Sequence, residues 1–495
     1  MKDRVHRADK DSKVKAVLLA LAVFTCFFSA YVPHLKNPFP IHVDEWQHLA
    51  QIIAISEGKP NLNPYVGERH FDFEILFHLI WAFPALLMGR VGFILFSRFI
   101  PAILAALSGF CLYFSLRKMK FSYIEALLSI FIFATLKSGL NLLGTAYFVP
   151  MSAAFPLMFL FLGYFSESVA EGKNILISTL LWVLLFMIYP PSATILLPAI
   201  ITYPLFFPNF IKKRAKLLLV FGIILTCMII TSLLIRLNGE VAFFLILKNL
   251  VFKFGWGGYE LKYSIPLLFT IPGFILALMG AYLKKGEDRP RLLLLAAFFS
   301  ILISFIFQIF NVSFLAPYQR VVYYVMIFMV PLAGVGLSKV YLFLYSRVGS
   351  TFAVIAVVLI LGLMFQLKYP SKSLSIDYAK PIMNMDAWNA LLWARDNLPN
   401  DSVILSDFML SSAVTPIAGR VVQAVLPAQL GTFDRQEERL VDAIKFFNNG
   451  ECSEKLGIID KWNVSVVISD KRETCLEFEG FQLAYAKNYF IYRKY

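Results

Sequence analysis

Long apolar segments separated by short polar ones constrain the fold of this chain more than any other feature. Hydrophobic residues make up 59% of the 495 residues and charged residues only 16%, a balance that soluble globular proteins do not reach. Eleven runs are long enough to cross a bilayer, alone or with tilt: 14–33, 91–116, 122–139, 150–165, 174–190, 191–208, 216–235, 264–283, 291–311, 320–343 and 352–366. The sequence therefore predicts an α-helical polytopic membrane protein with about eleven transmembrane helices.

The distribution of basic residues predicts how these segments are oriented. Cytosolic loops are enriched in Lys and Arg, and under this count the basic clusters 117–120, 212–216 and 284–291 share one side with the basic N-terminus. The first apolar run lacks an Ala-x-Ala-like cleavage site, so we interpret it as a retained anchor. We predict a multi-pass protein of the cell membrane with a cytosolic N-terminus and an extracytoplasmic C-terminal region.

The apolar segment 73–89 does not fit this pattern as a crossing, because it would move every later basic loop to the outer side. We place it in the outer interface, where the rings of His78 and Trp81 favour headgroup depth. The segment 46–55 repeats apolar residues at helical spacing and is expected to lie there too. The first outer loop, about 34–90, thus contains two predicted juxtamembrane helices.

The composition becomes polar near Lys368, which divides the chain into a transmembrane part, 1–367, and a soluble extracytoplasmic part, 368–495. Apolar periodicity in the second part predicts a small α/β domain. Its expected elements are helices over 386–398, capped by Asp386, and over 435–447, strands over 403–405 and 464–468, and a closing strand pair around 487–488. Cys452 and Cys475 would form a disulfide in an oxidising compartment, and two free thiols are the alternative.

An acidic pair with flanking histidines follows the first apolar run, in the segment 40–48, PIHVDEWQH. Polar groups beside a bilayer are costly and therefore indicate a function. Asp44 and Glu45 would point about 100° apart on a helix, so we expect one to act as a general base and the other to support it. In the alternative, Asp44 only caps the helix and Glu45 is solvated.

The histidines of this loop also leave a metal site open. His42, Asp44 and His48 could bind a divalent ion, with His70 and Asp72 in the same loop. Because surface histidines are more often solvated or hydrogen-bonded, we expect that no cofactor is required. The residues predicted to contact substrate are His42, Trp46, His48, His70 and Tyr318.

Three cations lie in or beside apolar segments, namely Arg98, Lys137 and Arg320. Charged residues in such positions usually face a cavity or a partner. A guanidinium can bind phosphate through two parallel hydrogen bonds, so the three are predicted to bind the phosphate of a lipid-linked donor. Snorkelling to lipid headgroups, or a salt bridge to Asp44 or Glu45, is the alternative.

This layout resembles the C-type (GT-C) integral-membrane glycosyltransferases, which include protein O-mannosyltransferases, aminoarabinose transferases of lipid A and oligosaccharyltransferases. The matching features are an outer C-terminal domain, the acidic motif 42–46 in the first outer loop, the step 97–99 around Arg98, and the turn 189–193. The resemblance implies a GT-C-like fold, with Asp44 as the catalytic base and Glu45 as its neighbour. It also implies transfer of a sugar from a polyprenyl-phosphate donor to a hydroxyl of a lipid, glycan or protein, with the bilayer and these substrates as partners and no nucleic acid.

The chain departs from the oligosaccharyltransferase pattern in two places. The loop 140–150 contains no acid, and 254–260 is only faintly similar to the Trp-Trp-Asp-Tyr-Gly motif. A metal-dependent enzyme of that kind is therefore a second alternative, after a non-enzymatic transporter or flippase of lipid-linked sugars. Transporters usually contain internal repeats, and the sequence shows none. The His-Pro-Pro motif of several monosaccharide transferases is also missing, which leaves the sugar and the acceptor open.

Overall fold

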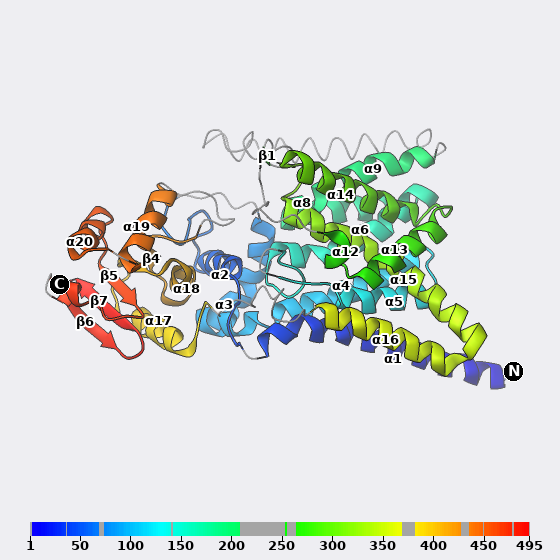
Figure 1. The fold of residues 1–495 in the computed structure, drawn as a ribbon, viewed down its shortest axis with the longest axis horizontal. Coiled ribbons are helices and arrows are strands. Elements are labelled where there is room, and N and C mark those ends of the chain that lie inside the picture. Colours follow the sequence, from blue (N-terminus) through cyan, green and yellow to red (C-terminus); the bar gives the residue numbers. More distant parts are fainter. Residues whose placement is uncertain are drawn as a thin grey trace. The chain divides into compact units, whose positions relative to one another are not determined.

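The computed structural model describes residues 2–35, 37–68, 74–139, 142–207, 253–254, 264–368, 382–426, 435–448, 450–477 and 480–494. The chain forms two compact units, which are drawn in Figure 1. Unit 1 comprises Met1–Ala30, Pro101–Ala146 and Pro150–Ser375. Unit 2 comprises Tyr31–Ile100, Tyr147–Val149 and Ile376–Tyr495.

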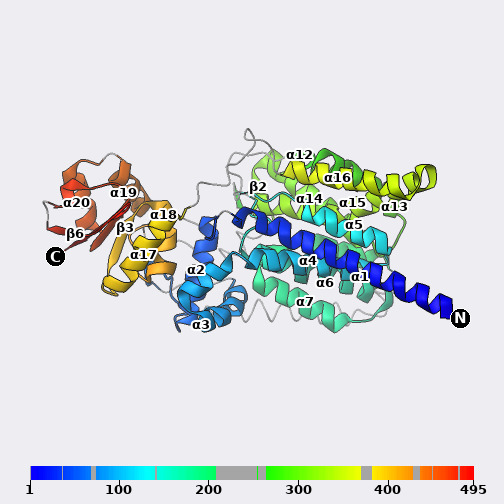
Figure 2. The same cartoon turned by 90° about the horizontal axis from the view of Figure 1, so that it is seen from below.

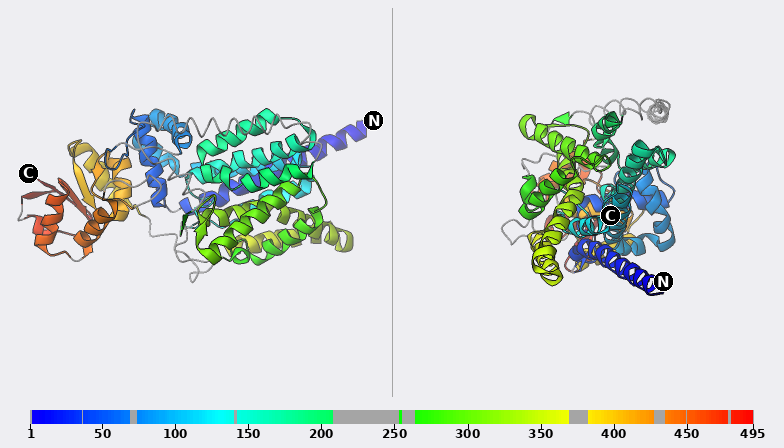
Figure 3. Two further views of the ribbon diagram at one scale, coloured as in Figure 1. Left: turned by 90° about the horizontal axis from the view of Figure 1, so that it is seen from above. Right: turned by 90° about the vertical axis from the view of Figure 1, so that its right-hand side faces the viewer.

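Unit 1 is a bundle of apolar helices (Figure 2, and end-on in the right panel of Figure 3). A short antiparallel pair joins β1 (Lys253–Phe254) to β2 (Val312–Ser313). The described helices are α1 (Lys2–Tyr31), α4 (Ile100–Lys118), α5 (Tyr123–Ala134), α6 (Pro150–Glu171), α7 (Ile175–Ile188), α8 (Pro190–Thr194), α9 (Leu197–Thr202), η2 (Tyr203–Phe206), α12 (Ile265–Leu268), α13 (Ile271–Lys284), α14 (Arg291–Phe310), α15 (Tyr318–Val348) and α16 (Ser350–Lys368).

The helix α15 occupies the centre of unit 1. It packs against α5, α13, α14 and α16, and it is buried from Tyr318 to Ser338. Small residues allow the close approach to α13: a Cβ atom on Gly280 would overlap the backbone carbonyl of Leu332, and one on Gly336 would overlap that of Leu276. Close backbone contact through small residues is how apolar helices associate where no hydrophobic force acts between them.

The polytopic α-helical membrane fold is confirmed. Seven described helices are long and apolar enough to cross a membrane, and shorter apolar helices accompany them. The predicted run 91–116 is wrong as one helix, because α3 (Ile75–Ser97) ends and α4 begins at Ile100. The run 191–208 is divided into α8, α9 and η2, each of which has a proline in its first two positions. The run 216–235 lies outside the described residues, so the number of crossings stays a prediction.

Unit 2 combines η1 (Val32–His34), α2 (Val43–Ser56) and α3 with a small α/β region. Although α3 is long enough to cross a membrane, Gly89 interrupts its helical backbone with a φ of 68°. The sheet has the order β4-β3-β5-β7-β6. Its strands are β3 (Val403–Ser406), β4 (Val421–Val422), β5 (Val466–Ser469), β6 (Phe481–Ala486) and β7 (Phe490–Lys494), and its helices are α17 (Met385–Asn397), α18 (Phe408–Ala418), α19 (Gln436–Asn448), α20 (Cys452–Lys461) and α21 (Thr474–Glu477).

The α/β character predicted for the C-terminal region is confirmed, and β3 and β5 run parallel at its centre. Residues from the sheet and from α19 form its core, for example Leu405, Phe446 and Tyr492. The predicted cap of α17 is wrong. Asn384 caps this helix by accepting a hydrogen bond from the backbone N–H of Ala387, so Asp386 lies inside the first turn.

Cys452 and Cys475 form a disulfide, which excludes the alternative of two free thiols. The bond joins the start of α20 to α21 and closes a loop with a sequence separation of 23. Cys26 and Cys111 are buried.

The helices α2 and α3 pack directly on the α/β region. The contact is made by α18 with α2 and α3 (Figure 1). The Tyr65 hydroxyl donates to the carbonyl of Ser412 over 2.7 Å, and Gln47 donates to the carbonyl of Leu426 over 2.9 Å. The segment that carries the acidic motif thus belongs to the same compact unit as the C-terminal region, while the predicted domain boundary at 367/368 stays a prediction.

Candidate functional site

The acidic motif forms the first turn of α2, and a histidine begins this helix. The Nδ1 atom of His42 accepts a hydrogen bond from the backbone N–H of Asp44 over 3.1 Å, and the Glu45 carboxylate accepts from the backbone N–H of His42 over 2.9 Å. These reciprocal bonds are a capping box. The alternative in which Asp44 caps the helix is therefore wrong, because His42 does so.

Glu45 is a buried anchor of this turn, with only 1% of its surface exposed. Besides His42, its carboxylate accepts hydrogen bonds from the backbone N–H groups of Ile41, over 2.7 Å, and Phe148, over 2.8 Å. Burial raises the pKa of Glu45 to about 7, although the three N–H donors act to lower it. The alternative of a solvated Glu45 is wrong, since backbone groups engage both of its oxygens.

Asp44 lies beside this anchor and keeps 8% of its surface exposed. Its Oδ1 atom is 3.6 Å from the Nδ1 atom of His42. The His42 ring in turn contacts Tyr147 edge-on, with ring centres 5.8 Å apart. The adjacent carboxylates therefore have different surroundings: the backbone holds Glu45 through three hydrogen bonds, whereas Asp44 lies beside the His42 imidazole.

Trp46 and His48 point into the interior of unit 2. Trp46 is fully buried, and His48 is 1% exposed. The Nδ1 atom of His48 lies 3.0 Å from the Nε2 atom of His78 and 3.8 Å from the Oε2 atom of Glu74. The structure thus places His48 against the start of α3, and His78, which we expected at headgroup depth, is buried as well.

The described residues contain one group of metal-ligating side chains whose ligand atoms lie within 4.8 Å of one another, namely His48, Glu74 and His78. The predicted set of His42, Asp44 and His48 is not brought together in this way. Sequence reasoning missed Glu74 and His78 as partners, although their spacing of four residues at the start of a helix was available as a signal. His70, predicted to contact substrate, lies outside the described residues, as does Asp72.

The predicted phosphate-binding cations are divided between the units. In unit 1, Arg320 is buried in the first turn of α15 and donates to the carbonyl of Leu142 over 3.0 Å. Lys137 donates to the carbonyl of Leu267, also over 3.0 Å. In unit 2, Arg98 follows the last turn of α3, and its guanidinium lies 4.7 Å from the centre of the Phe99 ring.

Tyr318 is the second candidate in the first turn of α15. Its ring stacks on Phe307 with centres 4.1 Å apart, and its hydroxyl accepts a hydrogen bond from Gln308 over 2.9 Å. Tyr318 is buried by these contacts. Five residues further along the helix, the Tyr323 hydroxyl accepts a hydrogen bond from the backbone N–H of Thr145. The start of α15 is therefore fixed by side chains and by the loop after Leu142.

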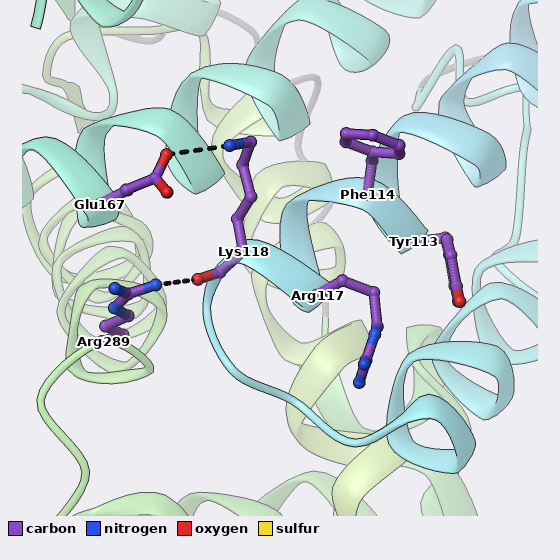
Figure 4. Close-up of a pocket in the computed structure, with 6 residues that line it drawn as sticks. All are labelled: Tyr113, Phe114, Arg117, Lys118, Glu167 and Arg289. Carbon is purple, nitrogen blue, oxygen red and sulfur yellow. Dashed lines mark hydrogen bonds and ion pairs between the residues drawn. The ribbon is translucent and has the colours of Figure 1, made fainter. Parts of the chain in front are cut away.

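A pocket of about 370 Å³ lies elsewhere in unit 1 and is lined by Tyr113, Phe114, Arg117, Lys118, Glu167 and Arg289 (Figure 4). Lys118 pairs with Glu167 over 2.9 Å, and Arg289 donates to the carbonyl of Lys118. Arg289 precedes α14 and Arg320 follows it, so the pocket and the Arg320 side chain belong to opposite ends of that helix. The pocket is therefore separate from the candidate site at the start of α15.

Comparison with known proteins places the fold. No protein-family profile matches the chain, and no curated protein matches its sequence. Among solved structures, apo ArnT from Cupriavidus metallidurans matches with a TM-score of 0.62 and 14% identity, over 98% of this chain and 98% of ArnT. The Archaeoglobus fulgidus oligosaccharyltransferase in its apo form matches with a TM-score of 0.60 and 14% identity, over 92% of this chain and 69% of that protein.

The chain shares its fold with ArnT and with the archaeal oligosaccharyltransferase. The agreement with ArnT covers nearly the full length of both chains, so the outer-loop helices and the C-terminal α/β region belong to the compared architecture. ArnT from the same organism has also been solved bound to undecaprenyl phosphate, with a TM-score of 0.61 and 12% identity, over 96% of this chain and 97% of ArnT. Within this fold, the acidic motif lies at the start of α2.

Proposed function

We propose that the protein is a glycosyltransferase that moves a sugar from a polyprenyl-phosphate donor to a hydroxyl acceptor on the outer face of the membrane. The proposal is carried by one observation: within a GT-C fold, the start of α2 presents Asp44 beside a Glu45 that the backbone holds in place. Two proteins of similar fold support the donor class. ArnT has been solved with undecaprenyl phosphate, and the archaeal oligosaccharyltransferase AglB with a dolichol-phosphate.

Asp44 is the proposed general base. In the reaction, the acceptor oxygen forms a bond to the sugar carbon while the bond from that carbon to the phosphate oxygen breaks. The hydroxyl proton moves to Asp44, and polyprenyl phosphate departs with the bonding electrons. Removing the proton as the oxygen attacks contributes about 10²- to 10⁴-fold to such reactions. Glu45 is a positioning residue in this scheme, since its oxygens accept from the backbone of Ile41, His42 and Phe148.

Arg320 is the proposed partner of the departing phosphate, with Arg98 and Lys137 as further cations. A preorganised cation where negative charge develops stabilises the transition state most strongly in a site that excludes water. Arg320 meets this description because it is buried and because its Nη1 atom is fixed by the carbonyl of Leu142. Among the residues predicted to contact substrate, His42 lies next to Asp44.

The disulfide supports the proposed orientation. Disulfides form and persist outside the cytosol, and Cys452 and Cys475 form one in unit 2. The C-terminal region is therefore proposed to be extracytoplasmic. The acidic motif shares that compact unit, which agrees with chemistry on the outer face, where a lipid carrier replaces a nucleotide as sugar donor.

An in vitro transfer assay tests the function. The purified full chain is incubated in lipid with a panel of polyprenyl-phosphate sugars and with lipid, glycan and peptide acceptors. We expect transfer from one donor, its loss in Asp44→Asn, and its retention in Asp470→Asn, a control that removes an exposed carboxylate of unit 2. Movement of labelled donor between leaflets without transfer would identify a flippase instead. Full turnover by a well-folded Asp44→Asn variant would overturn the role of Asp44.

A further inference from the structure

Three potential metal ligands converge between α2 and α3. His48 comes from the second turn of α2, Glu74 is the residue at which α3 begins, and His78 follows one turn later on the same face. The backbone N–H of His78 donates to the carbonyl of Glu74 over 3.1 Å, so these two side chains are held one turn apart. The group thus joins two helices that are adjacent in the sequence and packed together.

The distances match those of a metal site. Zinc is usually tetrahedral, with bonds of about 2.0–2.2 Å to histidine nitrogen and carboxylate oxygen, which separates its ligand atoms by about 3.3 Å. Here the Nδ1 atom of His48 is 3.0 Å from the Nε2 atom of His78 and 3.8 Å from the Oε2 atom of Glu74. These two separations lie on either side of the required one, and the ligand atoms of all three side chains lie within 4.8 Å of one another.

The donor set and its surroundings fit zinc better than calcium or magnesium. Two imidazoles with one carboxylate form a known zinc set that leaves a fourth position for water, whereas the harder cations require oxygen ligands. Both histidines are 1% exposed, and the Phe77 ring contacts His48 edge-on at 5.4 Å. Such an apolar shell limits the access of water and strengthens the attraction between the ion and the Glu74 carboxylate.

We propose that His48, Glu74 and His78 bind a zinc ion that fastens α2 to α3. The proposal does not depend on the transferase activity. It differs from the set predicted from sequence, because His42 serves as the cap of α2 and Asp44 lies beside it. His48 lies one turn after Asp44 on the same face of α2. The ion would therefore fix the helix that carries the acidic motif, and the three ligands are positioning residues with respect to Asp44.

Metal content provides the direct test. The full chain is purified in detergent without a metal-affinity step, equilibrated with zinc, desalted and analysed by mass spectrometry of the metal. We expect about one zinc per chain in the wild type and a loss in His48→Asn, Glu74→Gln and His78→Asn. His42→Asn is the matched control, since it removes another histidine of the same helix, and it should retain zinc. Cobalt in place of zinc should give the visible absorption of a four-coordinate ion.

Thermal unfolding provides a second readout. A ligand that binds only the folded state raises the unfolding temperature, so a chelator should lower the midpoint of the wild type and of His42→Asn. The chelator should leave the unfolding midpoint of His78→Asn unchanged. If the wild type contains no zinc and its unfolding midpoint does not change with the chelator, the proposal is overturned. The contact between His48 and His78 is then a hydrogen bond. Loss of zinc in His42→Asn but not in His78→Asn would instead favour the set of His42, Asp44 and His48.

Discussion

The carboxylate of Glu45 accepts a hydrogen bond from the backbone N–H of Phe148, 2.8 Å away. The two residues are 103 positions apart, and both belong to unit 2. Phe148 also packs its ring against Phe77 and Trp81 of α3, with centres 5.2 and 5.4 Å apart. One residue of a short segment therefore contacts both juxtamembrane helices, and Glu45 connects the first turn of α2 to it.

This relationship predicts a pH dependence of stability. Because burial raises the pKa of Glu45 to about 7 from its ordinary value of 4.5, the folded chain binds an extra proton between these limits. The free energy of unfolding should be highest below pH 4.5 and should fall as the pH rises from there to about 7. For a pKa shift of this size the loss is about 3 kcal/mol. Glu45→Gln cannot titrate and should flatten the profile. Thermal unfolding at pH 5 and pH 8 checks this, and parallel profiles for both proteins would contradict it.

Arg320 should be sensitive even to a change that preserves its charge. Arg320→Gln removes the cation from the start of α15 and is expected to lower transfer by about 10²- to 10³-fold. Arg320→Lys retains a positive charge but loses the planar fork that binds phosphate, so its activity should be intermediate. Arg347→Gln, at the exposed far end of the same helix, is the control. Transfer rates at saturating donor give the comparison, and equal rates for Arg320→Gln and the control would exclude the proposed role.

The disulfide should stabilise the C-terminal α/β region. Closing a loop with a sequence separation of 23 restricts the unfolded state and contributes about 3 kcal/mol. Reduction, or replacement of Cys452 and Cys475 by serine, should accelerate hydrogen exchange in α20 and α21 while leaving α15 unchanged. Exchange measured by mass spectrometry on the full chain, with and without reductant, tests this. Unchanged exchange in α20 would show that the bond is dispensable.

The contact between α13 and α15 should tolerate no added methyl group. In Gly280→Ala, the new Cβ atom would overlap the backbone carbonyl of Leu332, which cannot rotate away. Such overpacking costs about 1–3 kcal/mol, so the unfolding midpoint should fall. Gly362→Ala in α16 is the control, because nothing lies within 4 Å of its Cβ position. A small gain in stability is expected for Gly362→Ala, because alanine has the higher helix propensity. An equal fall of the unfolding midpoint in both variants would show that the contact is not specific.

Local signals in the sequence predicted the elements of unit 2 well. The helix of the acidic motif and the strands β3 and β5 follow from apolar periodicity, which depends only on neighbouring residues. The caps were harder to predict. A histidine is not among the usual capping residues, so His42 was not recognised, and Asn384 was overlooked in favour of Asp386.

Contacts between elements could not be read from the chain alone. The spacing of Asp44 and His48 placed both on one face of α2, but it did not show that His78 of α3 would meet His48. The burial of Glu45 likewise depends on Phe148, far away in the sequence. Interfacial placement by amphipathic rings was a plausible expectation for His78, yet packing of α2 on α3 removed that side chain from the surface.

The burial of the apolar window of α15, over Tyr318–Ser338, separates this part of the helix from the lipid. Only 22% of the apolar window of α1 and 17% of that of α16 is buried within the protein, against 100% for α15. A thicker or thinner bilayer changes the tilt of helices whose surfaces touch acyl chains, and α15 presents no such surface along that window. The position of Arg320 is therefore set by protein neighbours alone, and the same cation geometry should persist in membranes of different acyl-chain length.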